Sequence, residues 1–167
     1  MNSNPVADCY LKPGDFCLAL EPTIIKTVLG SCVTVTMYSP RTRIGAACHA
    51  LLPTCREEQE QHCPPGTCVN TFRYVECVIP EMFRQLQAQG LVAEELEIKL
   101  FGGADMMMGA LADHQRVGSL NVLKSKMMLA KMGVAIKSSE VGGGAGRKLI
   151  FDTRSGYVWI KRLNKSF

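Results

Sequence analysis

Alternating side chains between residues 33 and 38 are the feature that most constrains the fold of this chain. Valine and methionine alternate there with threonine and tyrosine, which is the pattern of a half-buried β-strand. Residues 39–43, Ser-Pro-Arg-Thr-Arg, predict a turn, and residues 44–52 predict the strand that returns from it. The sequence therefore predicts an antiparallel hairpin over residues 33–52.

This hairpin would bring a cysteine and a histidine close together. With the turn at residues 40–43, position 32 lies opposite position 50 or 51, so Cys32 and His49 approach diagonally across the pair. A free thiol has a reference pKa of about 8.5 and is mostly protonated at neutral pH, whereas an adjacent imidazole shifts it toward the reactive thiolate. The pair predicts a cysteine nucleophile with a general base.

Neighbouring residues suit the same chemistry. Gly30 gives a substrate carbonyl room to approach the backbone, and the N–H groups near Ser31 and Cys32 are candidate oxyanion donors. The hydroxyl of Thr27 is placed to orient the imidazole of His49. From these residues alone a second interpretation stays open, because most of eight cysteines belong to the core and a single histidine is often structural.

Five short segments resemble those of one protein family. They follow one another along the chain as Leu29–Val33, His49–Pro53, Phe101–Met106, Val117–Val122 and Glu140–Arg147. In this order they resemble the CheD family of chemoreceptor glutamine deamidases, over about residues 20–162. The resemblance implies that Cys32 is the nucleophile, His49 the general base and Thr27 the third site residue. Some relatives place the threonine one position earlier, where this chain has Lys26.

The resemblance also implies a reaction and partners. A glutamine side-chain amide is hydrolysed to glutamate and ammonia through a thioester, with no cofactor and no metal. The substrates would be helices of methyl-accepting chemotaxis receptors, and a CheC-type phosphatase is a further expected partner. Two alternatives use the same fold: an adaptor that binds receptors or the phosphatase without efficient catalysis, and a receptor glutamyl methylesterase with the same nucleophile.

Length and element order predict the fold class. The chain has 167 residues, 47% of them hydrophobic, so we expect a single domain over residues 1–167. Strands, a helix, a strand, a second helix and further strands predict an α/β layered sandwich, with a mixed sheet packed against two main helices; the resemblance implies the layers. No signal peptide and no membrane span is predicted, which favours the cytoplasm.

Two helices are predicted, each with one apolar face. The first runs from Val75 to Leu86 and should kink or restart at Pro80. The second would bury a stripe consisting of Leu120, Leu123, Met127 and Ala130.

The glycines at residues 142–146 lack the Gly-Lys-Ser/Thr ending of a P-loop. We therefore expect that they let the backbone approach the active site or a substrate helix, and that they bind no nucleotide.

Cysteines between residues 55 and 77 raise the question of a metal site. Cys55, Cys63, Cys68 and Cys77, with His62, offer zinc ligands, but none forms the Cys-x-x-Cys pair that structural zinc sites usually contain. The sequence therefore favours reduced thiols and no metal. Residues 54–68 are polar and contain Pro-Pro-Gly, which predicts a mobile loop.

The C-terminal end carries an excess of positive charge. Against the single acidic residue Asp152 stand six basic ones: Arg147, Lys148, Arg154, Lys161, Arg162 and Lys165. This asymmetry favours an acidic partner, and glutamate-rich receptor helices fit it better than nucleic acid does.

Overall fold

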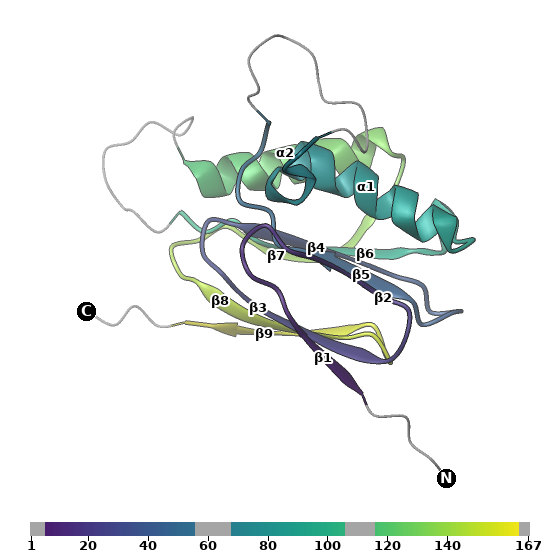
Figure 1. Ribbon diagram of the computed structural model, residues 1–167. Coiled ribbons are helices and arrows are strands. Elements are labelled where there is room, and N and C mark those ends of the chain that lie inside the picture. Colours follow the sequence, from purple (N-terminus) through teal and green to yellow (C-terminus); the bar gives the residue numbers. More distant parts are fainter. Residues whose placement is uncertain (1–5, 56–67, 106–115, 164–167) are drawn as a thin grey trace.

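Two β-sheets and two helices form three layers in the computed structural model, which describes residues 6–55, 68–105 and 116–163 (Figure 1). The four-stranded sheet has the order β1-β3-β8-β9, and the five-stranded sheet has the order β2-β5-β4-β6-β7. The strands are β1 (Ala7–Tyr10), β2 (Phe16–Ala19), β3 (Thr23–Leu29), β4 (Val33–Tyr38), β5 (Gly45–Cys48), β6 (Glu97–Gly102), β7 (Ile136–Val141), β8 (Arg147–Asp152) and β9 (Tyr157–Arg162).

Both main helices cover one face of the five-stranded sheet, and the four-stranded sheet covers its other face (Figure 1). The helices are α1 (Val75–Ala88) and α2 (Val117–Lys131), with short 3-10 turns at η1 (Thr71–Arg73) and η2 (Ala93–Glu95). Each sheet contains parallel and antiparallel pairs. The predicted α/β class with mixed strands and two main helices is confirmed, although the strands divide between two sheets.

The predicted hairpin and its register are confirmed. β4 and β5 are antiparallel, with Thr36 opposite Ala47, and a further bridge joins Val33 to Ala50. Continuing this register places position 32 opposite position 51. The turn closes when Arg43 N–H donates to the Ser39 carbonyl, and Arg43 itself adopts a positive φ of 62°.

The prediction that residues 33–38 form a half-buried strand was wrong. Every residue of β4 is buried, because the strand lies in the middle of the middle layer. Val35 and its apolar neighbours pack toward the helices, whereas Tyr38 belongs to the core between the sheets. Thr34 and Thr36 are also buried, at 0% and 1% exposure. Polar threonines at alternate positions look like a solvent face in the sequence, but the second sheet covers them here.

Helix α1 follows the sequence closely. It contains the predicted apolar stripe and runs through Pro80 as a single element, so the proline does not restart it. The chain reverses just beyond it, where Gly90 adopts a φ of 77°, which favours glycine.

Helix α2 buries a different face from the predicted one. Leu123 and Met127 are 57% and 56% exposed. The buried face is narrow and mostly small or polar, and its members are Gly118, Asn121, Ser125 and Leu129. The helix approaches the backbone very closely, since a Cβ added to Gly118 would lie 2.6 Å from the Ala104 carbonyl oxygen. Close backbone packing therefore selected small residues where an apolar stripe was expected.

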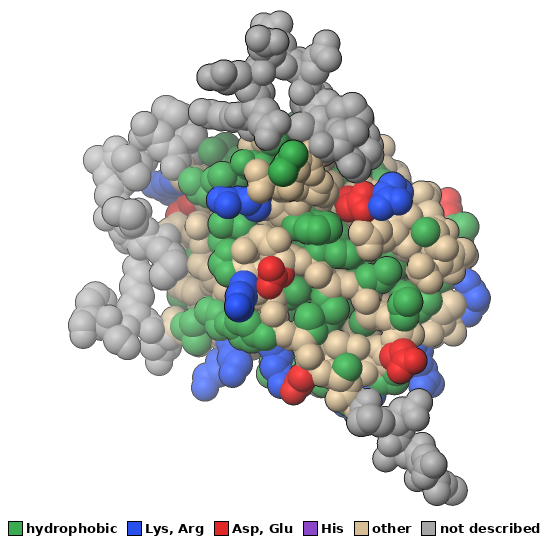
Figure 2. All heavy atoms as spheres, viewed as in Figure 1, with side chains coloured by type: hydrophobic (Ala, Val, Ile, Leu, Met, Phe, Trp, Pro, Cys, Tyr) green, Lys and Arg blue, Asp and Glu red, His purple; other side chains and the backbone are tan. Residues whose placement is uncertain are grey.

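Three of the six basic residues in the C-terminal cluster form ion pairs within the molecule. Arg147 and Arg162 both pair with Glu140, and Arg154 pairs with Asp152. Lys148 and Lys161 are exposed, whereas Lys165 lies outside the described residues. Figure 2 shows Lys and Arg side chains along the lower edge of the molecule, near the four-stranded sheet. The excess charge available to a partner is thus smaller than the sequence suggested.

Most of the predicted 54–68 loop lies outside the described residues. Among the helices in the described part of the chain, none is long and apolar enough to cross a membrane.

Candidate active site

The turn between β3 and β4 carries the candidate nucleophile. Ala104 N–H donates to the Gly30 carbonyl at 2.9 Å, and Gly103 N–H donates to the Cys32 carbonyl at 2.8 Å. Within the described residues, the backbone N–H groups of residues 31 and 32 donate to no other backbone carbonyl. Since its carbonyls are engaged and these amides donate to no backbone carbonyl, the turn is suited to bind an oxyanion.

Asn121 joins this turn to the segment that follows His49. Its Nδ2 donates to the Ser31 carbonyl at 3.0 Å and to the Leu51 carbonyl at 2.8 Å, and the residue is fully buried. One amide thus fixes the backbone beside both candidate catalytic residues. Sequence reasoning missed this residue, although it stands in the Val117–Val122 segment. The available signal was its place within the Val117–Val122 segment, which is one of the five that resemble the family.

Thr27 and His49 lie in direct contact in the core between the sheets. The Thr27 hydroxyl is 2.8 Å from His49 Nδ1 and also 2.8 Å from the Leu11 carbonyl oxygen, to which it donates. Because the hydroxyl has only one proton, it must accept at the histidine, so we assign the Nδ1–H tautomer. The unprotonated Nε2 of His49 is then the nitrogen that can accept a proton from a nucleophile.

Lys26 is placed differently from Thr27, its neighbour on β3. Its ammonium group forms an ion pair with Asp8 at 2.8 Å on the exposed side of the sheet. Successive residues of a strand point to opposite faces, so only one of the two can reach His49. In this chain the residue that contacts His49 is Thr27.

The connection between β1 and β2 holds the backbone of His49. His49 N–H donates to the Asp15 carbonyl at 2.9 Å, and the His49 carbonyl accepts from Gly14 N–H at 2.8 Å. Leu11, which accepts from Thr27, belongs to the same connection. Sequence reasoning assigned no role to this N-terminal segment, because its contacts with His49 are made by backbone atoms.

Cys32 and His49 share one face of the hairpin. The register places Cys32 diagonally across from His49, and Cys32 packs against the core between the sheets. Among the described contacts, no hydrogen bond joins the Cys32 thiol to the imidazole. Catalytic contacts are often loose in a protein without substrate and tighten when substrate binds. The structure thus brings Thr27 to His49, and places Cys32 beside them without a bond.

Burial shifts both candidate catalytic groups toward their neutral forms. It raises the pKa of the Cys32 thiol, because the thiolate loses solvation. It lowers the pKa of His49, against smaller opposing effects from the Leu11 carbonyl and Asp15. The free protein therefore holds a thiol beside a neutral imidazole. The expectation that an imidazolium stabilises a thiolate before substrate arrives has no support in these shifts.

The glycine-rich segment lies against the residues that support Cys32. Gly142 N–H donates to the Gly102 carbonyl and Asp105 N–H donates to the Gly143 carbonyl, both at 2.9 Å. Asp105 in turn bonds the hydroxyl of Ser119 in the first turn of α2. The glycines therefore let backbone segments approach one another beside the candidate site.

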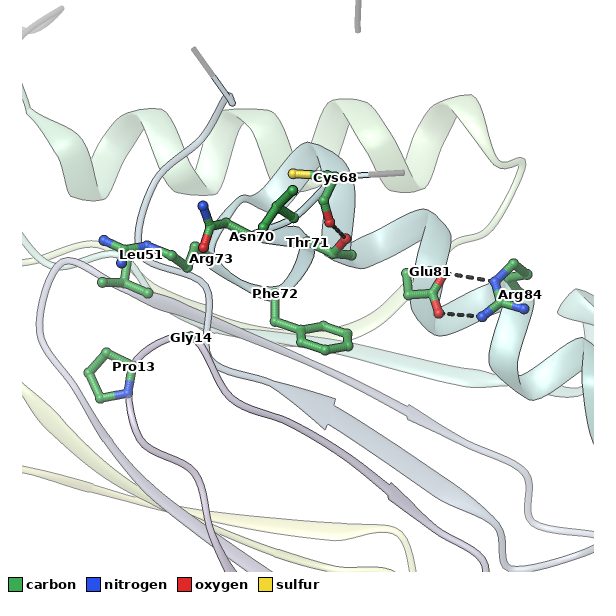
Figure 3. A pocket seen from close by; sticks show the side chains of 11 residues that line it. Pro13, Gly14, Leu51, Cys68, Asn70, Thr71, Phe72, Arg73, Glu81 and Arg84 are labelled. Atoms are coloured by element: carbon green, nitrogen blue, oxygen red, sulfur yellow. Dashed lines mark hydrogen bonds and ion pairs between the residues drawn. The ribbon is translucent and has the colours of Figure 1, made fainter. Parts of the chain in front are cut away.

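A cavity of about 450 Å³ lies beside the candidate site (Figure 3). Pro13, Gly14 and Leu51 form part of its wall, and an ion pair between Glu81 and Arg84 of α1 lies at its edge. Thr27, Cys32 and His49 are not among its lining residues. The cavity therefore adjoins the backbone that holds His49 and does not contain the reacting groups.

Comparison with known proteins identifies the family. A profile of the CheD family, described as CheD chemotactic sensory transduction, matches residues 51–162, well over half of the chain. The chain belongs to the CheD family. It is 44% identical over 157 residues to the "probable chemoreceptor glutamine deamidase CheD 2" of Geobacter sulfurreducens, covering 94% of this chain and 91% of that protein.

Two further members of the CheD family are similar over nearly the whole chain. Both are named "probable chemoreceptor glutamine deamidase CheD". The protein of Maridesulfovibrio salexigens is 39% identical and covers 98% of this chain and 96% of its own length. The protein of Methanococcus maripaludis is 32% identical and covers 91% of this chain and 93% of its own length.

Replacing Thr27 by Val should lower kcat by about 10- to 100-fold, because the imidazole loses the hydroxyl that sets its tautomer and orientation. The loss should appear in kcat more than in KM, as measured by steady-state kinetics with a receptor fragment. Thr34→Val is the matched control, since Thr34 is also buried and its hydroxyl has no partner within the described residues. Equal kinetics for the two variants would contradict the role of Thr27.

Replacing Asn121 by Ala should lower kcat about tenfold and the free energy of unfolding by about 1–3 kcal/mol, because two buried carbonyls lose their donor. Asn121→Asp keeps the volume but cannot donate when ionised, and should be at least as harmful. Ser125→Ala is the control one turn along α2, where the hydroxyl bonds only to the helix backbone. Wild-type kcat in both Asn121 variants would limit this residue to stability.

The pH profile of kcat/KM should show that the active form of the free protein holds a neutral Cys32 thiol and a neutral His49 imidazole. Because the pKa of His49 is lowered from 6.5, the acid limb should lie below pH 6.5, where the imidazole becomes protonated and loses its function as a base. Because the pKa of Cys32 is raised from 9.0, the alkaline limb should lie above pH 9.0. An alkaline limb well below that value would instead indicate a preformed thiolate and imidazolium.

Proposed function

We propose that this protein deamidates glutamine side chains of chemoreceptors. It belongs to a family whose members are named as probable chemoreceptor glutamine deamidases. The observation that carries the proposal is the arrangement at His49: Thr27 and Leu11 hold Nδ1, and Nε2 is left to act as a base beside Cys32. A thiol, a base and free backbone amides are the groups that amide hydrolysis needs.

The proposed reaction proceeds in two steps. His49 Nε2 takes the thiol proton as Cys32 Sγ attacks the glutamine amide carbon, and the N–H groups of Ser31 and Cys32 hold the oxyanion. The imidazolium returns its proton to the departing ammonia, which leaves a thioester on Cys32. Water, activated by the same imidazole, then cleaves the thioester to glutamate and restores the thiol.

The raised pKa of the Cys32 thiol determines at which step of this mechanism the thiolate forms. A thiol that is protonated in the free protein does not react rapidly with any passing electrophile. The thiolate would form only when a substrate amide occupies the turn and its developing oxyanion is bound. Substrate binding therefore activates the nucleophile, which suits an enzyme that modifies selected side chains of a larger protein.

The partners and the compartment are part of the same proposal. We place the reaction in the cytoplasm, on helices of methyl-accepting chemotaxis receptors, with a CheC-type phosphatase as a second partner.

One observation favours the alternative of an adaptor: Leu123 and Met127 expose apolar surface on α2. This surface does not compete with the proposed chemistry, since it belongs to the face of α2 opposite Asn121.

Replacing Cys32 by Ala should lower deamidation by at least about 1,000-fold, because no other group can form the thioester. The assay is release of ammonia from a receptor cytoplasmic fragment, with mass spectrometry to identify each glutamine converted to glutamate. Cys17→Ser is the control, since this thiol is half-buried and burial raises its pKa to about 12. Full activity of Cys32→Ala would exclude the mechanism; no deamidation by the wild type would favour the adaptor.

A further inference from the structure

Three cysteines that are far apart in the sequence meet at the start of α1. Cys55 follows the His49–Pro53 segment, Cys68 precedes η1, and Cys77 lies in the first turn of α1. Their sulfur atoms all lie within 4.8 Å of one another. The sequence offers these cysteines as possible zinc ligands but favours reduced thiols without a metal, because none of the pairs has the Cys-x-x-Cys form. Tertiary structure alone creates the cluster.

One sulfur–sulfur separation in the cluster matches that of a tetrahedral thiolate site. A tetrahedral zinc ion with Zn–S bonds of about 2.3 Å holds its sulfur ligands about 3.8 Å apart. The Sγ atoms of Cys55 and Cys68 are 3.8 Å apart. A disulfide would use two of the three sulfurs and leave the third beside it, whereas one cation uses all three. The geometry therefore favours a cation over a disulfide.

The backbone around the cluster is well supported. Cys55 N–H donates to Glu76 Oε1 at 2.7 Å, and the Cys68 carbonyl accepts from the Thr71 hydroxyl at 2.6 Å. Glu76 also pairs with Lys124 of α2 at 3.4 Å, so both helices help to hold the segment. Cys68 is buried and the other two cysteines are half-buried. These contacts hold the backbone of Cys55 and Cys68 before any ligand binds, which lowers the entropic cost of binding.

We propose that Cys55, Cys68 and Cys77 bind one soft divalent cation of the zinc type. Binding would displace one proton from each thiol and form three metal–sulfur bonds, and a fourth ligand would complete the tetrahedron.

This site would act on stability and would not take part in the chemistry. Cys55 and Cys68 border residues 56–67, which lie outside the described residues, so a cation would join the two ends of that segment. It would also tie the chain beyond His49 to α1, where Val75 N–H already donates to the Leu52 carbonyl. Closing a loop in this way stabilises the folded state mainly by restricting the unfolded chain.

Metal titration of the full chain tests the proposal. Protein stripped of metal under reducing conditions should bind one Zn²⁺ per chain and melt at a higher temperature. Co²⁺ should give a thiolate-to-metal charge-transfer band. Each of Cys55→Ser, Cys68→Ser and Cys77→Ser should weaken Zn²⁺ binding by at least about 100-fold. Cys9→Ser should bind as the wild type does, because Cys9 lies beside Cys17 and outside the cluster.

A second measurement uses the wild type, so its result does not depend on whether the serine variants fold. Zn²⁺ should protect Cys55, Cys68 and Cys77 from alkylation, as mapped by mass spectrometry, and leave Cys9 reactive. Absence of Zn²⁺ binding by the reduced wild type, equal affinity in all the serine variants, or equal protection of Cys9 would overturn the proposal. A Cys55–Cys68 disulfide that persists under reducing conditions would do the same. None of these readouts depends on deamidase activity.

Discussion

The amide of Asn121 is the interaction on which the arrangement of the site depends. It is one buried donor group shared by two carbonyls, those of Ser31 and Leu51, which lie beside Cys32 and His49 respectively. A buried carbonyl without a donor costs about 1–3 kcal/mol, so both strands of the hairpin are tied to α2 at the point where the chemistry would occur. The small buried face of α2 follows from this contact, because only small neighbours allow the helix to come so close.

Backbone polar groups do most of the positioning around Cys32 and His49. Gly103 and Ala104 hold the carbonyls of the β3–β4 turn, and the β1–β2 connection holds the backbone of His49. The Thr27 hydroxyl donates its single proton to the Leu11 carbonyl and accepts Nδ1–H of His49, which orients the imidazole. Rigid backbone contacts of this kind place reacting groups without spending side-chain entropy.

Burial favours the uncharged forms of both candidate catalytic groups in the free protein. It raises the pKa of the Cys32 thiol and lowers that of the His49 imidazole, and both shifts favour the uncharged forms. The same burial strengthens any hydrogen bond that a bound oxyanion receives from the turn. A thiol in such a site has low intrinsic reactivity and would react when the correct substrate is bound, which limits side reactions.

Local patterns in the sequence determined the β4–β5 hairpin, its register and the proximity of Cys32 to His49, because strand alternation and turn residues act over short distances. They also determined helix α1 and the resemblance to the CheD family. Contacts between distant segments decided the rest: the burial of Thr34 and Thr36, the polar buried face of α2, the role of Asn121 and the meeting of Cys55, Cys68 and Cys77. The periodicity of the sequence does not predict such contacts, since each depends on which layers and backbone segments the folded chain brings together.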